Sequence, residues 1–147
     1  VALTEEGGEA ERMRHLAKLL TPVISVPLVI DSTEPAVIEA ALRVIPGRSL
    51  INSTHLESGL DRAKNVFSMA KTYNAAVIAL TIDEKGMARN CGEKLAVAKR
   101  IFDLAVKKHG IFPEDIFSLK SLALNKTISL TCIPFGSITV RNSPFLR

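Results

Sequence analysis

The sequence has little of several residue types that mark particular protein classes, with no Trp, one Tyr and two Cys among 147 residues. Cys91 and Cys132 stand far apart, with no His or Cys nearby at the spacing of metal ligands. This pattern argues against a metal site or a disulfide framework and predicts a reduced, cytoplasmic setting. No apolar run approaches the roughly 20 residues that a membrane-spanning helix needs. The stretch from Val1 also lacks the basic-then-apolar pattern of a secretory signal.

Acidic residues are absent from the last part of the chain. Residues 1–117 hold fifteen acidic and fifteen basic side chains, whereas residues 118–147 hold four basic side chains and no acidic one. A nucleic-acid footprint would be a clustered basic stripe with aromatic or polar readers, and these four residues are scattered along the segment. The net charge of +4 therefore predicts no nucleic-acid partner.

What the sequence does contain is an alternation of short β-like runs and amphipathic helical patterns over residues 1–117. Apolar spacing predicts helices over Glu9–Leu20, from Pro35 to the Pro46-Gly47 stop, over about Leu60–Tyr73 and over about Glu93–Lys108. Strands are predicted at Val1–Thr4, Val26–Ile30, Ser49–Ile51, Ala75–Ile82 and Asp115–Phe117.

Several details accompany this assignment. Ser32 and Thr33 are expected to cap the second helix, and Leu60 and Leu95 are expected on buried helix faces. Strands that are apolar on both faces and alternate with helices predict an α/β protein with a parallel sheet. Either a TIM barrel or an open doubly wound sheet fits this pattern, and periodicity does not choose between them.

Polar residues end three consecutive predicted strands: Asp31 after PLVI, Asn52 after SLI and Asp83 after VIALTI. Both architectures place ligands at the carboxyl ends of their strands. A carboxylate accepts from ring N–H and amino groups, and a carboxamide can donate or accept, so together they suit a flat heterocycle. Each residue alone can equally tighten a turn or cap a helix. Three in register favour a binding site.

The segments around these residues resemble a known family. Asp31–Pro35 reads DSTEP, Ile51–Thr54 reads INST and Leu80–Gly86 reads LTIDEKG. In this order and spacing they resemble the pterin-binding domain of cobalamin-dependent methionine synthases and the methyltetrahydrofolate:corrinoid methyltransferases. More distantly, they are similar to dihydropteroate synthase. Val1–Thr4 and Pro113–Phe117 also look like segments of that family, so the resemblance covers about residues 1–117.

The resemblance implies a partial TIM (β/α)8 barrel of about four βα units. It also implies that Asp31 and Asn52 hydrogen-bond the pterin ring of methyltetrahydrofolate and that Asp83 faces the same pocket. Further candidates are Ser53, Thr4 and Lys85, the last for the glutamate tail of a folate. The parent protein would transfer the N5 methyl group to cobalamin or a corrinoid on another domain or protein. No catalytic residue and no metal ligand is identified in this chain.

The resemblance stops after Phe117, where the family has an Asp-Pro-Leu-like segment whose aspartate contacts the pterin. This chain has Ser118-Leu119 there, and residues 118–147 form a divergent tail that predicts a β-hairpin or a disordered segment. About four βα units cannot close an eight-stranded barrel. We therefore expect a fragment that does not transfer methyl groups by itself. The alternatives are a dihydropteroate synthase-like enzyme and an inactive remnant.

Overall fold

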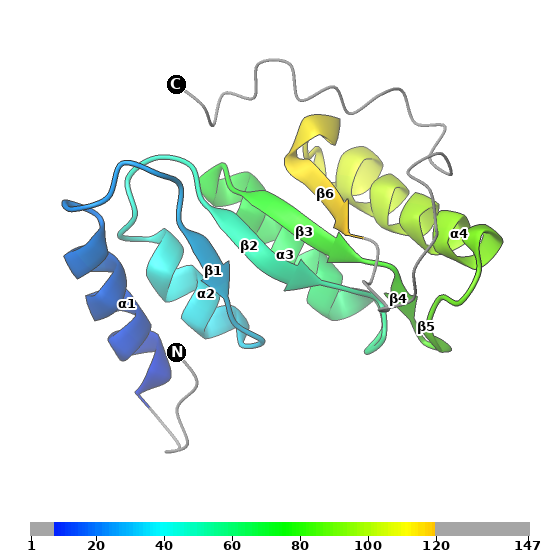
Figure 1. Cartoon of the computed structure of the whole chain (residues 1–147), viewed down its shortest axis with the longest axis horizontal. Coiled ribbons are helices and arrows are strands. Elements are labelled where there is room, and N and C mark those ends of the chain that lie inside the picture. Colours follow the sequence, from blue (N-terminus) through cyan, green and yellow to red (C-terminus); the bar gives the residue numbers. More distant parts are fainter. Residues whose placement is uncertain (1–7, 120–147) are drawn as a thin grey trace, which may run out of the picture.

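The computed structural model describes residues 8–119, in which strands and helices alternate (Figure 1). The helices are α1 (Glu9–Leu20), α2 (Pro35–Leu42), α3 (Leu60–Tyr73) and α4 (Cys91–Phe102), which continues as the π-helix η1 (Asp103–Lys108). The strands are β1 (Val29–Asp31), β2 (Leu50–Thr54), β3 (Ala76–Leu80), β4 (Ile82–Asp83), β5 (Gly86–Met87) and β6 (Ile116–Leu119), and the 3-10 turn η2 (Pro113–Asp115) precedes β6. The predicted strand at Val1–Thr4 and the tail beyond Leu119 lie outside the described residues.

The main sheet has the strand order β1-β2-β3-β6, and every neighbouring pair is parallel. Strands therefore follow one another in space as they do along the chain. A doubly wound sheet would reverse its order at a switch point and carry helices on both faces. Figure 1 instead shows α2 and α3 behind the strands, with α1 at one end and α4 at the other. This one-directional winding confirms the predicted partial barrel.

The hydrophobic core lies between the sheet and the helices. Ile30, Ile51 and Val77 are consecutive partners across β1, β2 and β3, and all three are buried in one cluster. Phe67 of α3 and Ile38 of α2 are completely buried in the same cluster. Because successive strand residues point to opposite faces, the residues on either side of this buried row face away from the helices.

The limits of α1 and α3 are as predicted, whereas α2 ends at Leu42, before the predicted stop at Pro46-Gly47, and α4 begins at Cys91 rather than at Glu93. Two core assignments were also wrong. Leu60 is 39% exposed because it is the first residue of α3, beyond the end of the packed stripe. Leu95 is 43% exposed. The buried stripe of α4 runs through Val97 and Ile101, and Leu95 lies two residues from Val97, on the opposite side of the helix.

The start of α2 and the start of β1 also differ from expectation. The N-cap of α2 is Glu34, with no side-chain cap; the hydroxyl of Ser32 instead accepts a hydrogen bond of 3.1 Å from the Glu34 amide. Strand β1 begins at Val29 and leaves out Val26 and Pro27. Proline has no amide hydrogen to donate to a neighbouring strand, so pairing begins only after it.

An ion pair joins the amino ends of two strands. Arg48 lies just before β2 and Asp115 just before β6, and their side chains form a salt bridge. The Asp115 side chain is 6% exposed and that of Arg48 is 24% exposed. Burial raises the pKa of Asp115, and the opposing charge of Arg48 only partly offsets this. The pair therefore connects strands that lie on either side of β3.

The raised pKa of Asp115 predicts a specific pH dependence of stability. As the pH rises above 3.8, the usual value, the carboxyl ionises in the unfolded chain before it ionises in the folded one. The stability contributed by the protonated group is complete below that pH and is lost as the pH passes through the raised pKa. The free energy of unfolding of the parent, minus that of Asp115→Asn, should therefore fall over this range in urea titrations.

Glu34→Gln, which changes an exposed acid at the start of α2, serves as the control and should leave this pH-dependent component in place, because Glu34 is not among the charges that act on Asp115. If the free energy of unfolding of the parent, minus that of Asp115→Asn, instead increases with pH, the attraction of Arg48 outweighs burial and the pKa of Asp115 is lowered.

Candidate functional site

Two of the predicted site residues come together at the carboxyl end of the sheet. Asp31 of β1 and Asn52 of β2 are direct register partners, and the amide of Ser32 donates a 3.3 Å hydrogen bond to the Asn52 carbonyl oxygen. Asp31 is exposed and Asn52 is half-buried. Neighbouring strands lie about 4.8 Å apart, so one small ligand can contact both side chains.

Both side chains lie on the sheet face turned away from the helices. Their neighbours in sequence, Ile30 and Ile51, belong to the helix-side core, and strand alternation places Asp31 and Asn52 on the other face. In a barrel, this is the inner face. A carboxylate and a carboxamide thus meet on a surface that no helix of residues 8–119 covers.

Ser53 lies at an irregularity of β2. Asn52 pairs with Ile78 and Thr54 with Ala79, so the register shifts across Ser53, as at a β-bulge. The shift turns Thr54 to the helix side, where it is completely buried. Ser53 is half-buried and follows Asn52 directly along β2. Thr4 lies outside the described residues.

Asp83 occupies a different part of this end of the molecule. It lies five residues beyond Ile78, the residue level with Asn52, in a hairpin formed by β4 and β5. Its Oδ1 accepts a 2.9 Å hydrogen bond from the amide of Lys85, and its Oδ2 is 3.5 Å from Nη1 of Arg100. The carboxylate therefore already serves the turn and an ion pair. Lys85 is exposed at the tip of the hairpin.

Arg100 fastens this hairpin to α4. Its guanidinium donates to both carboxylate oxygens of Glu84, over 2.8 Å and 3.1 Å, a bidentate geometry that adds directionality to the ion pair. The hydrogen bonds from Arg100 lower the pKa of Glu84 to about 2. The amide of Leu56 also donates a hydrogen bond of 2.9 Å to the Ile82 carbonyl oxygen, and this bond connects the loop after β2 to the hairpin.

Sequence reasoning missed the hairpin and Arg100. Ala75–Ile82 reads as one continuous apolar strand, whereas β3 ends at Leu80 and a separate two-residue strand follows. Gly86, which has a positive φ of 95°, is the signal that could have revealed the turn. No local pattern indicated Arg100, because it is sixteen residues from its partner Glu84.

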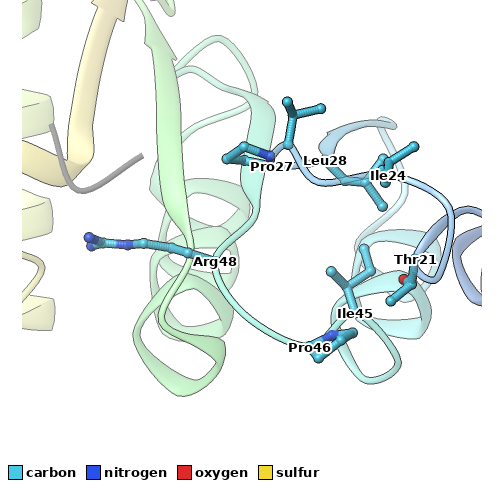
Figure 2. Close-up of a pocket in the computed structure, with 8 residues that line it drawn as sticks. Thr21, Ile24, Pro27, Leu28, Ile45, Pro46 and Arg48 are labelled. Atoms are coloured by element: carbon cyan, nitrogen blue, oxygen red, sulfur yellow. The ribbon is translucent and has the colours of Figure 1, made fainter. Parts of the chain in front are cut away.

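A small cavity lies at the opposite end of the sheet. It has a volume of about 60 Å³ and is formed by the chain before β1 and around Pro46, including Ile24, Leu28 and Ile45 (Figure 2). Figure 2 shows the Arg48 side chain extending away from Ile24 and Ile45. The cavity lies at the amino ends of the strands and is therefore separate from Asp31 and Asn52.

Two features that would indicate other classes of protein are absent from residues 8–119. This part of the chain has no group of three or more His, Cys, Asp or Glu side chains that could hold a metal ion. Within the same range, every helix is too short or too polar to cross a bilayer. Cys91, at the first position of α4, is an exposed free thiol, and Cys132 lies outside the described residues.

The sequence profile that describes pterin binding enzymes matches residues 2–119. This match covers the main sheet, its helices and both Asp31 and Asn52. The chain belongs to the pterin-binding enzyme family. The partial barrel is thus that of a pterin-binding domain.

The chain is similar to two methionine synthases. The chain is 38% identical over 107 residues to methionine synthase of Mycobacterium tuberculosis, a match that covers 71% of this chain and 9% of the relative. It is 37% identical over 102 residues to methionine synthase of Mycobacterium leprae, covering 67% of this chain and 8% of the relative. The chain thus spans less than a tenth of the length of these relatives.

The contact between Arg100 and Glu84 at the rim of this pterin-binding domain can be tested directly. Arg100→Met removes the hydrogen bonds that depress the Glu84 pKa, so this value should rise from about 2 toward 4.5. A carboxyl NMR titration measures it. Arg89→Met, an exposed arginine in the loop before α4, is the control and should leave the Glu84 pKa at about 2. An unchanged value in Arg100→Met would show that the hairpin is not held by this pair.

Proposed function

We propose that this chain binds methyltetrahydrofolate, as part of a domain that presents the N5 methyl group to cobalamin or a corrinoid in methionine synthesis. The observation that carries the proposal is the register pairing of Asp31 with Asn52 on the open face of the sheet. Membership of the pterin-binding family and similarity to two methionine synthases support it.

The pair has the chemistry that a pterin ring requires. The pyrimidine half of the ring offers N–H and amino donors beside a carbonyl acceptor. The Asp31 carboxylate can accept from two donors, and the Asn52 carboxamide can accept at its oxygen and donate from its nitrogen. Two side chains one strand apart can therefore hold one edge of the ring in a fixed orientation.

Transfer of the methyl group sets a further demand on the site. The cobalamin or corrinoid of the partner would supply the acceptor for the methyl group, and the electron pair of the broken C–N bond would stay on N5. Without a proton, N5 would have to leave as an anion, which is very unfavourable, so the site must favour N5 protonation. Fixed carboxylate and amide groups in a preorganised pocket suit this electrostatic task.

The proposal assigns the cobalt-carrying partner to another domain or protein, in the cytoplasm. The chain matches 9% of a methionine synthase, so the acceptor chemistry would take place on the parent protein and not on this chain alone. Asp83, Ser53 and Lys85 are proposed as contributors at the rim of the site, and no catalytic residue is assigned. A dihydropteroate synthase-like activity is less supported, because both relatives are methionine synthases.

Binding can be measured by calorimetry with the 147-residue chain and 5-methyltetrahydrofolate. Asp31→Asn replaces an acceptor that faces ring donors, and Asn52→Ala removes a paired amide, so each should weaken binding by roughly ten- to a hundredfold. Asp61→Asn changes a carboxylate that is 91% exposed on α3, and its affinity should match that of the parent chain.

Absence of binding by the parent chain would contradict the proposal. So would equal affinities for Asp31→Asn and Asp61→Asn, because the strand-end pair would then have no part in recognition.

A further inference from the structure

The row that contains Asp31 and Asn52 continues across the sheet as an apolar surface. Asn52 is the register partner of Ile78 on β3, and Ile78 is the partner of Phe117 on β6. Asp31, Asn52, Ile78 and Phe117 thus form one cross-strand row. With strands about 4.8 Å apart, the row measures roughly 14 Å, longer than a fused two-ring heterocycle.

Phe117 lies on the same face as the polar pair. Its neighbour Ile116 packs against the helix-side core, so alternation turns Phe117 to the other face. Ile78 is also outside the helix-side core, although it is only 9% exposed, whereas the flanking Val77 and Ala79 belong to that core. Phe117 itself is 37% exposed, which is unusual for so large an apolar side chain in a parallel sheet.

We propose that Phe117 is a binding and specificity residue of the site, packing against the second ring of the pterin while Asp31 and Asn52 hold the first. This inference rests on the proposed function and goes beyond it. A flat bicyclic ligand that is hydrogen-bonded at Asp31 and Asn52 and lies along the row extends over Ile78 toward Phe117. Aromatic side chains contact flat rings by stacking or edge-to-face packing, and binding sites combine a few polar anchors with apolar walls.

Because the row is polar at Asp31 and Asn52 and apolar at Ile78 and Phe117, substitutions in its two parts should change the affinities for two ligands differently. Isocytosine is the pyrimidine half of a pterin, with the same donors and acceptor but no second ring. Asp31→Asn should weaken the binding of both isocytosine and 5-methyltetrahydrofolate. Phe117→Leu should weaken the binding of 5-methyltetrahydrofolate by roughly three- to tenfold and leave isocytosine unchanged.

The chain provides a matched control for this substitution. Phe112 is 57% exposed, lies outside the strands and contacts Lys71, whose Nζ is 5.0 Å from the centre of the ring. Phe112→Leu removes the same atoms from the surface and should bind both probes as the parent chain does. Circular dichroism of both variants shows whether the fold is retained.

A second measurement does not depend on a loss of affinity. Because the chain has no Trp, Phe117→Trp introduces a single fluorophore at the proposed contact. Its emission should be quenched as 5-methyltetrahydrofolate is added, whereas that of Phe112→Trp should not respond. If 5-methyltetrahydrofolate binds but neither Phe117 variant responds differently from its Phe112 counterpart, the assignment of Phe117 is overturned and the proposed function stands. If the parent chain does not bind 5-methyltetrahydrofolate, both are overturned.

Discussion

The parallel register of β1, β2 and β3 is the constraint on which the rest of the structure depends. It aligns Ile30, Ile51 and Val77 as one buried row, and the next residue on each strand as a second row on the opposite face. A slip of one residue would exchange the two faces and bury Asp31 against the helices. The helix-side core and the polar pair therefore result from the same pairing, and burial of the core fixes the position of the site.

Within residues 8–119, α2 and α3 pack against one side of the sheet and no helix covers the other side, which has a consequence for function. The other face is left to side chains with two kinds of chemistry, polar at β1 and β2 and apolar at β3 and β6. A ligand with one polar edge and one extended ring fits such a surface better than an ion or a fully polar molecule. The cavity beside Ile24 and Leu28, at the amino ends of the strands, is small and has no comparable polar pair.

Much of this arrangement could be predicted from the sequence, because hydrophobic periodicity reports burial. The limits of α1 and α3 and the position of Asp31 at the end of β1 follow from it. Asn52 was predicted to end its strand, but it is the third of the five residues of β2. Periodicity does not encode contacts between distant residues. The bidentate contact of Arg100 with Glu84 and the alignment of Phe117 with Asn52 depend on tertiary pairing, and only the folded chain reveals them.

The central claim is that the carboxyl end of β1 and β2 forms the pterin site, and an amide NMR titration with 5-methyltetrahydrofolate tests it most directly. The isotope-labelled 147-residue chain should show shifts concentrated at Asp31, Asn52 and Ile78. The amides that line the cavity at the other end of the sheet, such as Ile24 and Arg48, should remain unchanged. If the amide signals of Ile24 and Arg48 shift while those of Asp31 and Asn52 do not, the ligand does not bind at the carboxyl end of β1 and β2.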